Sequence, residues 1–356
     1  MTREKDLGSA ESVIGDEEFD FDDIVINSTV YRRAYYSYTI KAAQATTADN
    51  EKGTHKTEIE TGKEDDMPTG ISSKFMVLRD EDYFDLEFQR PLFAIHEWVL
   101  RFSEHSVTQT CRLVSEIGDD KVIDRLDNSV LDGSDVDTLL ADRVKRRDVL
   151  MAVTTNMIWE FIFTRYLFGL VRETRQRLKS LEKVLGEAGP RSAVMLWRAI
   201  TLTLISKGEP FIRQNIQDTE VVTHVIFETL TQILPLPSQP DAVSLQDSLR
   251  TVVKSAVDLS VAMRTQLAEY MMLPPLLPEY DVNGDLASKD SFNAVLMNDR
   301  SGSGISNEDL EEQHATVKHV LFPLVVKKED NNGKGDDEIV IYPAQVVVSR
   351  QNMGVA

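Results

Sequence analysis

The sequence predicts a mainly α protein: a multi-helix bundle around a long central helix, with a C-terminal β-hairpin and a disordered acidic N-terminal tail. Three observations support this prediction. The run from Ser134 to Glu187 contains no proline and only two glycines, Gly169 and Gly186. Apolar residues recur at helical spacing on both sides of that run. Near the C-terminus, two segments rich in Val and Ile flank a polar turn that contains glycine.

The composition limits the classes of function. The chain has 356 residues, of which 42% are hydrophobic, so it is long enough to bury a sizeable core. Its 59 acidic residues outnumber 39 basic ones and give a net charge of −20, which argues against generic nucleic-acid binding. A single cysteine, Cys111, cannot form an internal disulfide, and the N-terminus lacks an apolar signal region. We therefore expect an intracellular protein of the cytoplasm or nucleus.

Changes in composition divide the chain into three parts. Residues 1–73 are expected to be a largely disordered acidic tail and linker, because the first 24 residues include nine acidic side chains. Within them, residues 25–40 are rich in Ile, Val, Thr and Tyr, which predicts a short strand. Residues 74–273 form the predicted helical domain. Residues 274–356 form a loop-rich segment that ends in the hairpin.

Local signals place the helices in order. Pro91 suits the first turn of a helix, and a second helix is expected through Cys111. Ser134 and Asp137 resemble a cap before the central run, which is one long helix or two helices divided near Asp148 or Gly169. Further helices are expected over Arg191–Lys207, from a cap at Asp218 or Thr219 to Leu234, over Asp241–Leu273, and after a cap at Ser306.

The C-terminal hairpin is predicted from two segments, 317–328 and 338–350. Both are rich in Val and Ile, and the residues between them include Asn and Gly, which favour turns. Pro323 and Pro343 lie inside these strands. Proline cannot donate a ladder hydrogen bond, so both positions suit strand edges or bulges.

The apolar stretch 149–171 has the length of a membrane span, but its polar residues argue against one. Asn156, Glu160 and Arg165 lie near its middle. A central Arg or Asp costs about 2.5–3.5 kcal/mol on insertion, and apolar neighbours offset only part of that cost. We therefore predict a helix buried by its neighbours, with Glu160 and Arg165 beside the core and partnered.

A cluster of basic residues flanks the apolar stretch. Between residues 140 and 185, ten basic residues face five acidic ones, so this segment is positive in a negative protein. One interpretation is a solvated helix face that the acidic tail covers. The other is a docking surface for an acidic partner, a membrane or RNA, although no recognised module supports RNA. The candidate docking residues are Lys145, Arg146, Arg147, Arg172, Arg175, Arg177, Lys179 and Lys183.

A short heptad pattern overlaps this basic cluster. It spans only two heptads, so packing inside the bundle is favoured over self-association. Its members are Val171, Thr174, Leu178, Leu181 and Leu185.

No motif predicts catalytic, cofactor-binding or metal-ligating residues. His96 and Glu97 begin like a zinc-protease motif, but Leu100 stands where the second histidine is needed. Asp281 begins a calcium-loop pattern that fails at Leu286, where a glycine is required. The sequence favours a non-enzymatic interaction or scaffold module over an enzyme with an unrecognised site. A further alternative is a peripheral membrane protein that uses the basic helix and its aromatic neighbours.

Two stretches of the chain carry a resemblance to known sequences. They are IWEFIFTRYLFGLVRETRQRLKSLEKVL and AEYMMLPPLLPEYDVNGDL, the second followed by FPLVVKKEDNNGKGDDEIVIYPAQVVVSR. These stretches resemble the C-terminal portion of uncharacterised proteins from filamentous fungi, over about residues 75–350. The resemblance implies a eukaryotic intracellular protein and assigns no functional residue.

Overall fold

The computed structural model describes residues 76–104, 110–236, 239–283, 286–330 and 336–349. The chain divides into two compact units, Met1–Thr61 and Gly62–Ala356, and all the described residues lie in the second. The tail and linker predicted for 1–73, with the strand at 25–40, lie outside the described residues.

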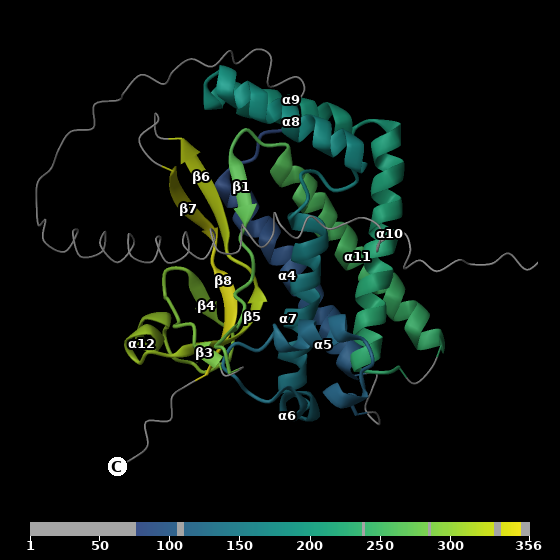
Figure 1. Ribbon diagram of the computed structural model, residues 1–356, viewed down its shortest axis with the longest axis vertical. Coiled ribbons are helices and arrows are strands. Elements are labelled where there is room, and N and C mark those ends of the chain that lie inside the picture. The colour runs from purple at the N-terminus through teal and green to yellow at the C-terminus, as the bar shows by residue number, and fades with distance from the viewer. Residues whose placement is uncertain (1–75, 105–109, 237–238, 284–285, 331–335, 350–356) are drawn as a thin grey trace, which may run out of the picture. The chain divides into compact units, whose positions relative to one another are not determined.

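The described residues are mainly helical, as predicted (Figure 1). The helices are α4 (Glu81–Glu104), α5 (Asp120–Asp127), α6 (Val136–Ala141), α7 (Lys145–Ile158), α8 (Arg172–Ala188), α9 (Arg191–Ser206), α10 (Glu209–Ile233), α11 (Gln239–Arg264) and α12 (Asn307–Glu312). A 3₁₀ turn, η1 (Val114–Glu116), precedes α5, and a π-helical turn, η2 (Trp159–Phe163), continues α7.

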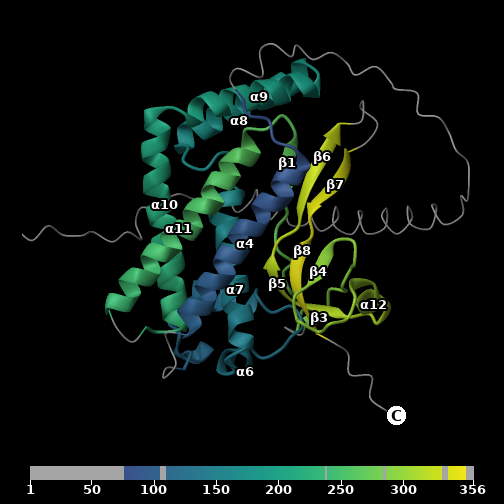
Figure 2. The ribbon, with the colours of Figure 1, turned by 180° about the vertical axis from the view of Figure 1, so that it is seen from behind.

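The helices and strands of this unit are arranged in layers. Helices α4 and α7 lie between the strands on one side and α10 and α11 on the other (Figures 1 and 2). Helices α8 and α9 lie together across one end of this arrangement, beside the N-terminal part of α10. Because α4 and α7 are covered on both faces, they carry most of the large, fully buried side chains.

The strands form two three-stranded sheets and one short pair. They are β1 (Glu269–Met272), β2 (Glu279–Tyr280), β3 (Leu286–Ser288), β4 (Met297–Asp299), β5 (Thr316–Phe322), β6 (Val325–Asp330), β7 (Asp336–Tyr342) and β8 (Ala344–Ser349). The strand orders are β1-β6-β7, β2-β3 and β4-β8-β5. Strand β4 pairs with β8 in parallel, and every other pair is antiparallel.

The predicted C-terminal hairpin is present, but each of its two strands is divided in two. Pro323 separates β5 from β6, and Pro343 separates β7 from β8. Opposite these breaks, Phe322 pairs with Gln345 in one sheet and Val325 pairs with Tyr342 in the other. Because proline cannot donate a ladder hydrogen bond, the hairpin changes sheets at these two positions.

The run from Ser134 to Glu187 is not one helix. It breaks at 142–144 and again at 164–171, so the central helix is α7 with η2. At the first break, the Asp142 carboxylate accepts hydrogen bonds from the Val144 and Lys145 amides, which competes with helical bonding. The expected break near Gly169 is confirmed, whereas the alternative break near Asp148 is wrong.

The cap predicted at Ser134 is also wrong by one residue. The N-cap of α6 is Asp135, whose carboxylate accepts from the Thr138 amide at 2.8 Å. The Ser134 hydroxyl instead accepts from Lys318 Nζ on β5 at 3.2 Å. Lys318 lies far from Ser134 in the sequence, so the local pattern cannot reveal this contact. The contact occupies the hydroxyl that would otherwise cap the helix.

The central helix is buried by its neighbours, as predicted. Every residue from Val149 to Thr155 is buried, and among the described residues no helix is long and apolar enough to cross a membrane. Glu160 and Arg165 are half-buried, and Glu160 Oε2 lies 2.6 Å from Arg125 Nη1. Arg165 Nε donates to the Phe161 carbonyl at 3.4 Å, so both charges have partners beside the core.

Other helix boundaries differ from the prediction where tertiary contacts decide them. Helix α4 begins at Glu81 and contains Pro91 in its interior, ten residues after its start. Cys111 lies in an extended segment rather than in a helix. Helix α10 begins at Glu209, with Pro210 in its first turn, so Asp218 and Thr219 lie inside it. The segment predicted to be helical to Leu273 ends at Arg264, and β1 follows.

An aromatic cluster joins α4 to the strands. Phe88 lies 6.0 Å from Tyr342 and 6.4 Å from Phe322, between ring centroids, and the Phe84 and Tyr270 centroids are 4.2 Å apart. All five rings are buried. The first helix of the described chain and its last strands therefore share one core.

Candidate functional site

The predicted docking residues fall into two separate groups. At the start of α7, Arg146 is only 6% exposed and its guanidinium lies against Cys111, with 4.0 Å between Nη1 and Sγ. Its neighbour Lys145 pairs with Asp142 at 3.5 Å, and Arg147 is half-buried. This group is therefore partly engaged within the fold and does not present an open basic surface.

The second group lies on α8 and forms a continuous stripe. Arg172, Arg175, Lys179 and Lys183 are spaced by three, four and four residues, which puts them on one face of the helix. We call these four residues the basic stripe. It extends about 16 Å, at about 1.5 Å per residue. Arg177, the other candidate on this helix, is exposed but lies off the stripe.

Helix α8 is held at the surface by a narrow contact. None of its 17 residues is fully buried. Leu178 packs against a small buried cluster that includes Leu167, Leu202 and Phe211. Of the heptad residues, Leu178 and Leu185 are half-buried while Leu181 is exposed, so the predicted packing inside the bundle is only partial.

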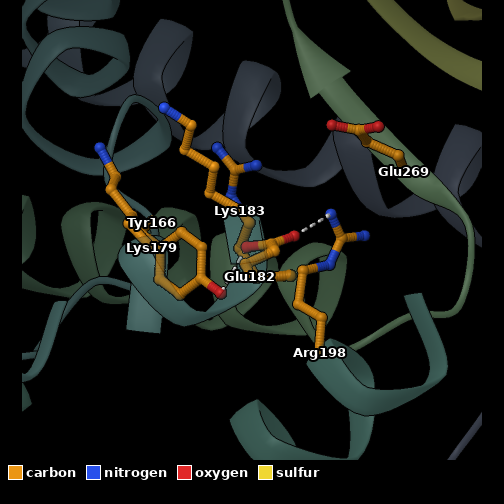
Figure 3. Close-up of a pocket in the computed structure, with 7 residues that line it drawn as sticks. Tyr166, Lys179, Glu182, Lys183, Arg198 and Glu269 are labelled. Atoms are coloured by element: carbon orange, nitrogen blue, oxygen red, sulfur yellow. Dashed lines mark hydrogen bonds and ion pairs between the residues drawn. The ribbon is translucent and has the colours of Figure 1, made fainter. Parts of the chain in front are cut away.

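A pocket of about 340 Å³ opens beside the C-terminal half of the basic stripe (Figure 3). It lies where α8, α9, the end of α11 and β1 meet. We call it the stripe pocket. Its lining residues are Tyr166, Lys179, Glu182, Lys183, Arg198, Arg264 and Glu269.

Tyr166, Glu182 and Arg198 form one wall of the stripe pocket, joined by one hydrogen bond and one ion pair. The Tyr166 hydroxyl donates to Glu182 Oε2 at 2.7 Å, and Arg198 Nη1 lies 3.8 Å from Glu182 Oε1 (Figure 3). Burial, reinforced by this hydrogen bond, raises the pKa of Tyr166, so its phenol keeps the proton that it donates. Arg198 is 7% exposed and its Nε has no hydrogen-bond partner, which is costly for a buried donor.

The remaining charges of the pocket are held in different ways. Arg264 Nη2 donates to the Phe163 carbonyl at 2.8 Å, which fixes this guanidinium at the end of η2. Glu269 Oε2 lies 3.1 Å from Arg191 Nη2. Lys179 and Lys183 are exposed and have no partner among the residues that the structure describes. The arrangement is suited to an anion, because the exposed ammonium groups of Lys179 and Lys183 can donate to one there.

The histidines and acidic clusters of the described residues bring no metal site together. Within the described ranges, no group of three or more His, Cys, Asp or Glu side chains could hold a metal ion. His96 Nδ1 lies 3.6 Å from Oε1 of its neighbour Glu97. His319 is buried on β5, and its Nδ1 donates to the Ser129 carbonyl at 2.8 Å. Burial lowers its pKa to about 4, which keeps the ring neutral.

Asp148 is a half-buried carboxyl that we expect to destabilise the fold at neutral pH. Burial raises its pKa from 3.8 to about 6, although Arg147, His96 and Lys318 oppose that shift. Since the folded-state pKa is the higher one, stability is lost as pH rises from about 4 through 6. We expect Asp148→Asn to raise the free energy of unfolding by about 1–2 kcal/mol at pH 7 and by almost nothing at pH 4.

Urea denaturation of both proteins at the two pH values measures this effect. The matched control is Asp258→Asn, because Asp258 is an exposed helical carboxylate and should change stability little at either pH. The lowered pKa of His319 has the opposite effect, because the protein loses stability as pH falls below about 6.5. Variant and parent are therefore compared with each other at the same pH. A loss of stability at pH 7 in Asp148→Asn would contradict the expectation.

Two residues of this site were predicted from the sequence, and its other charged residues were not. Lys179 and Lys183 were among the predicted docking residues, and both line the stripe pocket. Arg198, Arg264 and Glu269 were not predicted, because they come from elements up to about a hundred residues away. The unusual position of Arg198 in the apolar stretch of α9 was the one local signal that could have indicated it.

These features define a mainly α protein with a basic helix and an anion-compatible pocket at one end of its bundle. No protein-family model matches the chain, and no solved structure matches it. The chain is similar to Leashin from Aspergillus fumigatus, with 56% identity over 308 residues that cover 85% of this chain. The match spans only 6% of the length of Leashin. This finding confirms the resemblance to a filamentous-fungal protein.

Proposed function

We propose that this chain is a non-enzymatic interaction module that binds an acidic segment of a protein partner along the basic stripe of α8. One observation carries the proposal. Helix α8 buries none of its 17 residues fully and presents four cations on one face. A helix that packs so little of its surface within its own fold has most of that surface available to a partner.

The charge of the stripe also favours a specific role. The whole chain carries −20, so a row of four cations is an exception on a protein that otherwise repels acidic partners. Like charges three or four residues apart cost a helix about 0.2–0.5 kcal/mol per pair. Complementary charge speeds encounter and selects the partner, which offsets that cost in the complex.

Exposed apolar side chains lie on the side of α8 away from the stripe. Leu181 is 44% exposed and Val184 is 59% exposed, both on α8. They are nine and twelve residues after Arg172, which at about 3.6 residues per turn directs them away from the stripe. They therefore form a second, apolar surface, and the stripe attracts its partner by charge. The same side chains would serve self-association. With a single cysteine in the chain, we place this binding in the cytoplasm or nucleus.

The membrane alternative has less support. It relies on aromatic residues near the basic helix, but Phe161, Phe163 and Phe168 are buried. Trp159 is half-buried, and its indole donates to the Met272 carbonyl at 3.2 Å. These rings belong to the core, so membrane binding would have to depend on the cations alone. An enzymatic alternative would have to use Tyr166, whose hydroxyl donates to the Glu182 carboxylate in the lining of the stripe pocket. Burial raises the pKa of this phenol, so it keeps its proton and is a poor nucleophile.

The test is a capture experiment on extract from a filamentous fungus, using the full chain as bait. Reversing the stripe with Arg172→Glu, Arg175→Glu, Lys179→Glu and Lys183→Glu should abolish the partners that the parent retains at low salt. Raising the salt should weaken the parent's binding in the same way, because exposed charges are screened within about 10 Å at 0.1 M.

A second quadruple variant controls for the change in net charge. It reverses four exposed cations elsewhere in the described chain, Arg90, Lys121, Lys254 and Lys289, and should keep the partners. Equal capture by the parent and the stripe variant would refute docking on α8. Sedimentation of the parent alone reports whether a second copy of the chain is the occupant.

A further inference from the structure

The stripe pocket has the charge of a site for a doubly charged anion. Four cations and two carboxylates line it, which gives a net charge of +2. A phosphate monoester carries about −1.5 to −2 at pH 7, whereas a side-chain carboxylate carries −1. The pocket therefore matches a phosphate group more closely than a single carboxylate.

The carboxylates of the pocket do not cancel its attraction for anions. Glu182 accepts from Tyr166 and faces Arg198, and Glu269 pairs with Arg191. Each acid is thus neutralised by a cation of the fold, and the two ammonium groups remain without partners in the described structure. The free positive charge lies on Lys179 and Lys183, one helical turn apart.

The donors differ in rigidity, which suits recognition of a group with several oxygens. Arg198 is buried, is held against Glu182, and has one N–H without an acceptor. The two lysines are long, exposed side chains that can close over a bound group. The fixed charge of the guanidinium attracts an anion from the inside, and the mobile ammonium groups provide charge-assisted hydrogen bonds from the outside.

The size of the pocket exceeds that of a phosphate ion. Its volume of about 340 Å³ lies in the range of small-ligand sites. We propose that the stripe pocket binds the phosphate of a phosphorylated serine or threonine in the partner that docks on α8. This assignment rests on the proposed function, because the basic stripe would lead the acidic segment of that partner to the pocket.

The test measures binding of four probes to the full chain by nuclear magnetic resonance titration. The probes are N-acetyl phosphoserine amide, its glutamate counterpart, inorganic phosphate, and vesicles containing phosphatidylinositol 4-phosphate. We expect the phosphoserine probe to bind about tenfold more tightly than the glutamate probe, since one additional charge contact is gained. It should also bind more tightly than inorganic phosphate, because its side chain and amides fill the remaining space.

Two variants with the same loss of charge locate the site. Lys179→Gln with Lys183→Gln should remove the preference for phosphoserine. Arg172→Gln with Arg175→Gln, which neutralises the part of the stripe outside the pocket, should leave that preference unchanged. All four side chains lie at the helix surface, so folding should be preserved in both variants.

Each other outcome overturns the assignment. Equal binding of phosphoserine and glutamate would refute a phosphate site. Inorganic phosphate that binds as tightly as the phosphoserine probe would identify free phosphate as the ligand, and preference for the vesicles would identify a lipid. These results are independent of the capture experiment. A partner can dock on the stripe although the pocket binds no phosphate, and the pocket can bind phosphate although no partner docks on the stripe.

Discussion

Replacing Phe88 with alanine is expected to lower the free energy of unfolding by about 3–5 kcal/mol, the usual cost of removing a fully buried phenylalanine. Phe88 has no exposed surface, and its ring lies against Phe322 and Tyr342. The cavity left by the ring would lie between α4 and the strands, where a helix and two sheets cannot easily collapse together. Urea denaturation followed by circular dichroism measures the change.

Phe93 provides the matched control on the same helix. It is 58% exposed, so Phe93→Ala should change stability by less than about 0.5 kcal/mol. A double variant with Phe322→Ala measures the coupling between helix and strand, which we expect to be about 0.5–3 kcal/mol for rings in contact. Similar losses for the two single variants of α4 would contradict the position of the core given above.

Replacing Gly169 with alanine is expected to lower the free energy of unfolding by about 2–5 kcal/mol. Two costs add here. Gly169 has φ +87°, a conformation that costs an L-residue about 1–2 kcal/mol. An added Cβ would also lie 2.8 Å from Asn215 Cβ and 3.0 Å from Asn215 Cα on α10, and such overpacking costs about 1–3 kcal/mol.

Gly186 gives the opposite result and so controls for the change of residue. It lies within α8, and an added Cβ would meet no atom within 4 Å. Gly186→Ala should therefore leave stability unchanged or raise it by about 0.5–1 kcal/mol, because alanine favours helix. Thermal unfolding of both variants beside the parent distinguishes the two sites. A Gly169→Ala protein as stable as the parent would show that α10 can move away from the turn.

The sequence predicted the elements whose signals are local. Helix α9 lies where Arg191–Lys207 was expected, and Ser306 caps α12 by accepting from the Asp309 amide. Local signals failed where distant contacts dominate. Residues 269–272 continue a helical pattern in the sequence, yet they form β1, because β6 offers them a ladder that the local pattern does not show.

The basic stripe could be predicted from the sequence because it is a local pattern, whereas the stripe pocket could not, because it depends on tertiary packing. The stripe depends on helical periodicity within twelve residues, which the sequence displays directly. The pocket depends on where Arg198 and Glu269 come to lie beside α8, which is fixed by the packing of three helices and a strand. The raised pKa of the half-buried Asp148 carboxyl could not be predicted either, because it reflects surroundings that include Lys318 on β5.

The aromatic cluster between α4 and the strands has a consequence for how the protein folds during translation. Phe84 and Phe88 leave the ribosome about 250 residues before Tyr342, which completes their surroundings. At a synthesis rate of about 5–20 residues per second, the apolar face of α4 lacks the strands that finally pack against it for many seconds. Lys327 on β6, which pairs with Glu81 at 2.6 Å, arrives equally late. Until these strands emerge, α7 and α11, which also pack against α4, are the earlier elements that can shield its apolar face.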